Sequence, residues 1–190
     1  MALKNISAFR WSKRNAFYLA GVLSDAMDRS STLEVGSAAP DFQLPQENET
    51  MVSLERLLQS GPIVLLFIPS AWGFVCSVEM TTFRNRHEEF VSAGGQLVTI
   101  NTQSSRTNAV WGEHLHLPFH ILSDFDGEVS KRFGIFMGEE SYAPNTSNRA
   151  IFIITKEGRI TYIWVAEDPS NEPDYDEALS KLRETVAGRL

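Results

Sequence analysis

Apolar and polar positions follow one another along the chain in blocks that predict strands and helices in turn. Residues 63–68 are six consecutive apolar residues, mostly branched or aromatic, with a proline on each side. Such a short continuous run is typical of a central strand that is covered on both faces. After Cys76 the apolar spacing changes to three and four, which predicts a helix ending at Gly94 and Gly95. Its inward face comprises Met80, Phe83, His87, Phe90 and Val91.

The rest of the pattern continues this alternation. It predicts a hairpin formed by residues 43–44 and 51–54, followed by a short helix at 54–59. Further strands are predicted at 96–101, 119–122, 150–155 and 160–165, and further helices at 104–115, 128–133 and 174–190. Strand–helix alternation implies parallel crossovers, whereas the last two strands are joined by a turn that contains Gly158. The last helix is expected to point Ala178, Leu182 and Val186 inward. We therefore predict an α/β fold with helices on both faces of a central mixed sheet.

The first 34 residues differ in charge from the remainder. No acidic residue precedes Asp25. Four basic residues precede it: Lys4, Arg10, Lys13 and Arg14. This pattern resembles a targeting segment, either a signal peptide or a transit peptide. We favour an ordered helix after Ser12 that forms a docking or dimer-contact arm. The chain is thus divided into an N-terminal helical extension, residues 1–34, and one domain, residues 35–190.

Composition and charge exclude several classes of protein. The 190 residues, 43% of them hydrophobic, suffice for one sizeable core. The 24 acidic and 17 basic residues give a formal charge of -7, which argues against a nucleic-acid surface. No apolar run reaches the ~20 residues that cross a bilayer, so no membrane partner is expected. The single cysteine excludes an internal disulfide and fits a reducing compartment, for which we expect the cytoplasm.

Cys76 is the main candidate for chemistry because it lies in the first turn of a predicted helix. Backbone N–H groups there have no helical partner, and the positive end of the helix dipole favours an anion. A thiolate at this position is therefore stabilised. The alternative is that a lone cysteine serves only as a small buried hydrophobic residue.

The residues around the cysteine follow the pattern Pro69-x-x-x-Gly73-x-x-Cys76-x-x-Glu79. This pattern resembles the active-site motif of the peroxiredoxins of the alkyl hydroperoxide reductase and thiol-specific antioxidant family. In that motif Thr or Ser stands at the position of Gly73. The chain therefore resembles a one-cysteine peroxiredoxin that lacks this hydroxyl.

Three further segments carry the same resemblance. Residues 35–42 resemble the family's entry sequence G-x-x-A-P-D-F, and residues 117–134 follow the family pattern again. Arg149 opens the strand 150–155 at the place where the family has an arginine beside the cysteine. The resemblance covers about residues 35–188. It implies a thioredoxin-like sheet.

The resemblance also implies catalytic roles. Cys76 is the expected nucleophile, which the peroxide oxidises to a sulfenic acid. Arg149 is expected to stabilise the thiolate and to donate hydrogen bonds to the peroxide. Glu79 would orient Arg149, and Pro69 would shield the thiolate from water. The competing interpretations are that Pro69 merely ends a strand, that Glu79 is an ordinary acid of a first helical turn and that Arg149 is a solvated edge residue.

Gly73, Phe74 and Val75 occupy the substrate-binding positions of the motif. The implied substrate is hydrogen peroxide or an organic hydroperoxide, and no cofactor is required. An external thiol, either a thioredoxin-like protein or a small molecule, would return the sulfenic acid to the thiol. A homodimer is expected. A positive φ at Gly73 would strain any β-branched residue placed there.

Two other clusters suggest metal sites, and we prefer a structural interpretation of both. His114, His116 and His120 fit no metal-binding spacing. The acidic stretch 167–177 lacks the glycine and the alternating ligands of an EF-hand loop, so it is expected to be a solvated helix start. No metal is expected.

Two functions from different classes are therefore considered. The first is a thiol-dependent peroxidase. The second is a thioredoxin-fold redox sensor or interaction module with little peroxidase activity, which the missing hydroxyl at Gly73 keeps open.

Overall fold

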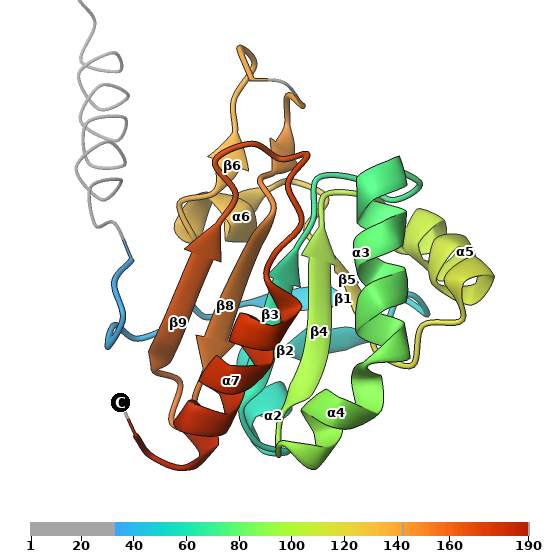
Figure 1. Ribbon diagram of the computed structural model, residues 1–190. Helices are drawn as coiled ribbons and strands as arrows, with labels where there is room; N and C mark the ends of the chain where they lie inside the picture. The colour runs from blue at the N-terminus through green and yellow to red at the C-terminus, as the bar shows by residue number, and fades with distance from the viewer. Residues whose placement is uncertain (1–32, 142, 190) are drawn as a thin grey trace, which may run out of the picture. The chain divides into compact units, whose positions relative to one another are not determined.

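The computed structural model describes residues 33–141 and 143–189. The helix predicted after Ser12, and nearly all of the predicted extension 1–34, lie outside this range. Within it, a five-stranded sheet has the strand order β5-β4-β3-β8-β9 (Figure 1). Its strands are β3 (Ile63–Phe67), β4 (Gln96–Asn101), β5 (Ile121–Ser123), β8 (Ala150–Ile154) and β9 (Ile160–Val165).

Six helices are described: α2 (Leu54–Leu58), α3 (Phe74–Asn85), α4 (His87–Ser92), α5 (Ser105–Leu115), α6 (Glu128–Arg132) and α7 (Tyr175–Val186). Two small antiparallel pairs complete the fold: β1 (Gln43–Pro45) with β2 (Met51–Ser53), and β6 (Phe136–Met137) with β7 (Thr146–Ser147). The predicted hairpin, short helix and sheet strands are present, whereas the pair β6–β7 was not predicted. None of the helices described here is long and apolar enough to cross a membrane.

The sheet is mixed, as predicted. Strand β3 pairs in parallel with β4, which pairs in parallel with β5, and β3 pairs antiparallel with β8, which pairs antiparallel with β9. In Figure 1, α3, α4 and α7 cover the near face of the sheet, and α6 lies behind it. The prediction of an α/β fold with helices on both faces is therefore confirmed.

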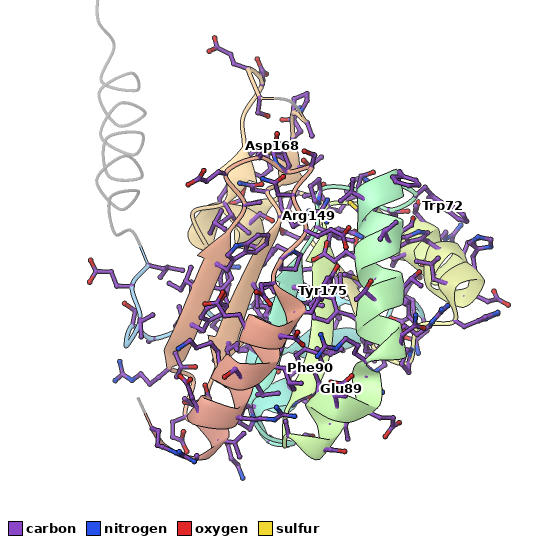
Figure 2. The ribbon with its side chains drawn as sticks, in the orientation of Figure 1. Trp72, Glu89, Phe90, Arg149, Asp168 and Tyr175 are labelled. Carbon is purple, nitrogen blue, oxygen red and sulfur yellow. The ribbon has the colours of Figure 1, made fainter. Side chains whose placement is uncertain are left out.

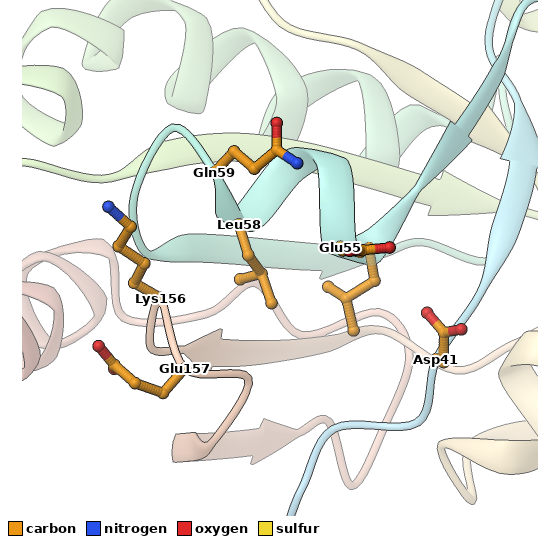
Figure 3. A pocket seen from close by; sticks show the side chains of 7 residues that line it. Asp41, Glu55, Leu58, Gln59, Lys156 and Glu157 are labelled. Atoms are coloured by element: carbon orange, nitrogen blue, oxygen red, sulfur yellow. The ribbon is translucent and has the colours of Figure 1, made fainter.

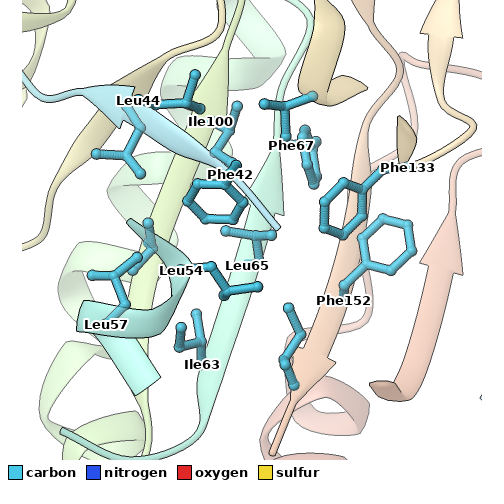
Figure 4. Packing of buried hydrophobic residues seen from close by; sticks show 14 of the residues in the cluster. Phe42, Leu44, Leu54, Leu57, Ile63, Leu65, Phe67, Ile100, Phe133 and Phe152 are labelled. Carbon is cyan, nitrogen blue, oxygen red and sulfur yellow. The ribbon is translucent and has the colours of Figure 1, made fainter. Parts of the chain in front are cut away.

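The central strand β3 is completely buried because both of its faces are covered. Its residues alternate between two hydrophobic clusters, as side chains of a strand must. Ile63, Leu65 and Phe67 pack with residues of β1, β2, α2 and α6, where the rings of Phe67, Phe133 and Phe152 are in contact (Figure 4). The intervening residues pack with α3, α4, α5 and α7 on the other face.

The helix predicted after Cys76 is in fact two helices. The break between α3 and α4 lies at Arg86, whose φ of -103° and ψ of 5° fall outside the helical region. The Arg86 guanidinium forms ion pairs with Glu89 and with Asp176 near the start of α7. Phe90 remains buried beyond the break, but Val91 is exposed, so its predicted inward position is wrong.

The inward face of α7 also differs from the prediction at one position. Ala178 and Leu182 are buried as expected, but Val186 is exposed. Thr185 takes the buried position in the last turn instead, and its hydroxyl lies 2.7 Å from the hydroxyl of Thr161 on β9. A pattern of apolar spacing does not include this polar contact, so it did not predict the burial of Thr185.

The strand pairing brings three chain segments to one end of the sheet. Phe67 at the carboxyl end of β3 is opposite Ala150, the first residue of β8. Ala150 is in turn opposite Val165, the last residue of β9. The loop that leads to Cys76, the residue Arg149 and the loop after β9 therefore converge at this end.

Two apolar residues of α7, buried Leu182 and exposed Val186, allow a test of this packing. Leu182→Ala should lower the free energy of unfolding by ~2–5 kcal/mol, because it leaves a cavity under the helix. Val186→Ala, the matched control on the same helix, should change it by no more than ~0.5 kcal/mol. Urea denaturation of both variants measures these values. Equal losses would contradict the described orientation of α7.

Candidate active site

The cysteine lies where the sequence predicted, in the first turn of α3. Gly73 is the N-cap residue, and the N–H of Ser77 donates to its carbonyl oxygen at 2.8 Å. Glycine has no side chain to accept from the first N–H groups of the helix. Those N–H groups therefore stay available for an anion or for an oxygen of a substrate.

A buried arginine joins the cysteine to a carboxylate. Nη2 of Arg149, a residue labelled in Figure 2, lies 3.5 Å from Sγ of Cys76. Nη1 of Arg149 forms an ion pair with Oε2 of Glu79. Arg149 is 1% exposed and Glu79 is fully buried. The interpretations of Arg149 as a solvated edge residue and of Glu79 as an ordinary first-turn acid are therefore wrong. The structure brings together Cys76, Glu79 and Arg149 from two distant parts of the chain.

A backbone carbonyl in the loop after β9 is a third partner of the Arg149 guanidinium. The carbonyl oxygen of Pro169 accepts hydrogen bonds from Nε of Arg149 at 3.0 Å and from Nη2 at 2.9 Å. The amide of Asn148 donates to the carbonyl oxygen of Ala166 at 2.9 Å, which ties this loop to the start of β8. The sequence did not predict the role of Pro169, because every residue has a backbone carbonyl and the residue type does not show which one binds an arginine.

The loop before the helix differs from expectation at two residues. Gly73 has a φ of -62°, so the predicted difficulty of a positive φ does not apply to it. A Cβ atom at this position would lie 3.3 Å from Sγ of Cys76. The positive φ belongs instead to Trp72, at 66°, and this side chain is half exposed and stacks on His114 with 5.2 Å between ring centres. Pro69 is buried just after the end of β3.

The remaining predicted residues lie around the helix start. Phe74 is 84% exposed and Val75 is half-buried, so only their backbone N–H groups belong to the helix terminus beside Cys76. The hydroxyls of Ser70 and Ser77 have other contacts. Ser70 donates to the carbonyl of Ala71, and the Ser77 hydroxyl accepts from the indole of Trp111.

Charge and burial oppose each other in the pair Arg149–Glu79. Burial raises the pKa of the Glu79 carboxyl to about 7, and the charge and the hydrogen bond of Arg149 counter this rise only in part. Burial also disfavours the charged guanidinium, but the charges of Glu79 and Cys76 outweigh it and raise the pKa of Arg149. Arg149 is therefore a permanent cation in the site.

The clusters considered for metal binding have separate structural contacts. His114 stacks on Trp72, and His120 contacts Glu47 at 3.1 Å. Asp174 accepts hydrogen bonds from the first N–H groups of α7, so the acidic stretch is a helix start, as predicted. Among residues 33–141 and 143–189, no three His, Cys, Asp or Glu side chains are grouped in a way that could hold a metal ion.

One cavity among the described residues lies apart from the cysteine. It has a volume of about 400 Å³ and is lined by residues of α2, by the turn between β8 and β9, and by Asp41 (Figure 3). None of the predicted site residues lines it. This cavity is therefore not part of the candidate site.

Comparison with known proteins agrees with this geometry. The sequence model of the AhpC/TSA family matches residues 35–163. The chain belongs to this family. It is therefore a peroxiredoxin, a peroxidase among the oxidoreductases, as the motif around Cys76 predicted.

Individual relatives match most of this peroxiredoxin. It is 30% identical over 132 residues to alkyl hydroperoxide reductase E from Mycobacterium bovis, covering 68% of this chain and 84% of the relative. It is 29% identical to peroxiredoxin Bcp from Escherichia coli, and the match covers 80% of this chain and 97% of the relative. The crystal structure of peroxidoxin BcpB from Mycobacterium tuberculosis aligns with a TM-score of 0.73 at 30% identity. The alignment covers 80% of this chain and 97% of that structure. The thioredoxin-like fold is thereby confirmed.

The buried Glu79 predicts an unusual dependence of stability on pH. Its pKa is about 7 in the folded protein and near the ordinary 4.5 in the unfolded chain. Between these values the folded state keeps a proton that the unfolded state has lost. Stability therefore falls as pH rises through this window, by roughly 3 kcal/mol from this group.

Urea denaturation at several pH values measures this fall. Glu79→Gln should remove it, because glutamine does not titrate. The matched control is Glu88→Gln, whose side chain is 92% exposed, and its curve should run parallel to that of the wild type. Equal slopes for all three proteins would show that Glu79 keeps an ordinary pKa.

Proposed function

We propose that this peroxiredoxin reduces hydrogen peroxide or an organic hydroperoxide through a sulfenic acid on Cys76. The observation that carries the proposal is the position of the Arg149 guanidinium, which contacts Sγ of Cys76 at the N-terminus of α3. A permanent cation and a helix N-terminus both favour the thiolate. The thiolate, not the thiol, is the nucleophile.

The reaction needs one bond to form and one to break. The thiolate attacks one oxygen of the peroxide, the S–O bond forms and the O–O bond breaks. The other oxygen departs with the electron pair and takes up a proton, which gives water or an alcohol. Arg149 and the free N–H groups of the first helical turn can stabilise the charge that develops on the departing oxygen.

The other motif residues have supporting roles in this proposal. Buried Pro69 keeps bulk water from the thiolate, and Glu79 orients Arg149 through their ion pair. The backbones of Gly73, Phe74 and Val75 form the substrate-binding side of the site. Only the N–H groups are available there, because Gly73 has no side chain and the Phe74 ring is exposed.

The sulfenic acid must be reduced from outside the chain, because Cys76 is its only cysteine. We propose a thioredoxin-like protein or a small thiol as the reductant and the cytoplasm as the compartment. A homodimer is also proposed, supported by the exposed apolar side chains of Trp72, Phe74 and Val78 around the start of α3. Analytical ultracentrifugation of the full chain tests this last point.

Stopped-flow mixing of the reduced protein with hydrogen peroxide tests the function directly. Intact mass should show one added oxygen at first and further oxygens with excess peroxide, because no second cysteine in the chain traps the sulfenic acid. Cys76→Ser should add none. A wild-type protein that does not react would instead support a redox-inactive interaction module.

Arg149→Lys should slow the oxidation of Cys76 by ~10²-fold, because lysine keeps the charge but not the planar fork that reaches Cys76, Glu79 and Pro169 together. The measurement is the second-order rate constant with hydrogen peroxide. Arg159→Lys, on the exposed turn between β8 and β9, is the control and should react like the wild type. An unchanged rate in Arg149→Lys would place Arg149 outside the reaction.

Gly73→Thr should accelerate the reaction with hydrogen peroxide by ~10-fold or more. Its φ of -62° suits threonine, and a side chain there starts 3.3 Å from Sγ of Cys76, so a hydroxyl can supply the missing donor. Gly73→Ala is the matched control, since it adds the same Cβ without a hydroxyl. Equal rates in the two variants would show that the hydroxyl contributes nothing here.

A further inference from the structure

We propose that Glu79 stores a proton while Cys76 is a thiolate, and gives this proton to the departing oxygen when the peroxide is cleaved. This inference rests on the proposed function and adds a second acid–base group to it. Orienting Arg149, the role assigned to Glu79 above, requires no transfer of a proton. The two roles therefore make different predictions.

The charges of the site favour one anion at a time. Arg149 is the cation that contacts both acids, with Nη2 on Cys76 and Nη1 on Glu79. A thiolate together with a carboxylate would leave one negative charge without a counterion, and both side chains are buried. An unpaired buried charge is costly, so a group in this position takes up a proton instead. Ionisation of Cys76 and protonation of Glu79 are thus linked.

The two oxygens of Glu79 have different surroundings. Oε2 accepts the hydrogen bond of Arg149, whereas Oε1 is buried and has no hydrogen-bond partner among the described residues. A charged oxygen in such a position has a large desolvation cost. A neutral carboxyl avoids it, because Oε2 continues to accept from Arg149 while Oε1 carries the proton. Oε1 is thus the oxygen free to give the proton away.

The neighbouring groups also favour the neutral carboxyl. Besides Arg149, the groups that interact electrostatically with Glu79 are Glu172, in the loop before α7, and Tyr175, the first residue of α7. The hydroxyl of Tyr175 donates to Oε2 of Glu172 at 2.5 Å, and this hydrogen bond holds the carboxylate of Glu172 in place. Its negative charge adds to the effect of burial in raising the pKa of Glu79.

Glu79 lies one helical turn after Cys76, on the same face of α3. In the proposed step the thiolate attacks the peroxide, and the departing oxygen takes the proton from Oε1 of Glu79. Thiolate, neutral Glu79 and hydrogen peroxide become sulfenic acid, ionised Glu79 and water. The net charge of the site is unchanged by this step. The medium therefore supplies no proton, whereas without Glu79 it must supply one.

Two measurements on the wild-type protein test this step at about pH 8. There the negative charge of the thiolate keeps the proton on Glu79 before the reaction, and Glu79, with its pKa of about 7, stays ionised once the neutral sulfenic acid has formed. Infrared difference spectra should show the band of a neutral buried carboxyl in the reduced protein and its loss when Cys76 becomes a sulfenic acid. A pH indicator in weak buffer should show no net proton uptake per sulfenic acid formed. Cys76→Ser should keep the carboxyl band after peroxide is added.

Glu79→Gln separates proton donation from orientation, because glutamine keeps an acceptor for Arg149 but has no proton to give. We expect no carboxyl band, uptake of about one proton per sulfenic acid and a loss of ~10²-fold in rate. The matched control Glu88→Gln removes one exposed carboxylate and should match the wild type in all three readouts. Circular dichroism and urea denaturation establish that each variant is folded, and the wild-type measurements stand even if Glu79→Gln does not fold.

The outcomes are distinguishable. If Cys76 is oxidised but the carboxyl band persists, or if the wild type and Glu79→Gln take up protons equally, the inference is overturned while the proposed function stands. If hydrogen peroxide does not oxidise Cys76 at all, the proposed function is overturned and this inference with it.

Discussion

The site depends on one buried guanidinium that serves two acids. Arg149 is almost completely buried, so its charge has to be balanced within the protein. Glu79 supplies the ion pair and the carbonyl of Pro169 supplies two further acceptors, which leaves Nη2 able to reach Sγ of Cys76 as well. Because Cys76 and Glu79 lie on α3 and Pro169 lies in the loop after β9, the guanidinium fixes these two segments relative to the start of β8. The same contacts that stabilise the fold therefore prepare the cysteine.

The sheet makes this arrangement possible. The antiparallel pairing of β3 with β8 places Arg149 at the end of the sheet where the chain leads to the start of α3. Strand β9 returns to the same end, and its following loop brings Pro169 to the guanidinium. A shift of β8 against β3 by one residue would turn Arg149 to the opposite face of the sheet, because side chains alternate along a strand. The buried residues on both sides of β3 and β8 prevent such a shift.

Glycine at the N-cap of α3 determines which hydrogen-bonding groups lie beside the sulfur of Cys76. It leaves the first N–H groups of α3 without a side-chain acceptor, which favours the binding of an anion but removes a hydroxyl beside the sulfur. The hydroxyls of Ser70 and Ser77 do not replace it, since each has a different contact. Electrostatic support of the thiolate therefore comes from the backbone and from Arg149.

The sequence by itself determined most of the elements and the family. An unbroken apolar run predicted β3, Ser104 and the spacing after it predicted α5, and Gly158 predicted the turn between β8 and β9, because these signals act over a few neighbouring residues. The motif around Cys76, together with Arg149, predicted the family for the same reason.

Only the tertiary structure decided what depends on contacts between distant segments. These features include the break at Arg86, which pairs with Asp176 across the fold, and the rotation of α7 that buries Thr185 in place of Val186. They also include the carbonyl of Pro169 on Arg149 and the unpaired oxygen of Glu79. Burial and partnership are properties of three-dimensional surroundings. The sequence could therefore name Glu79 as a site residue, but only the fold shows a buried carboxyl that shares one cation with Cys76.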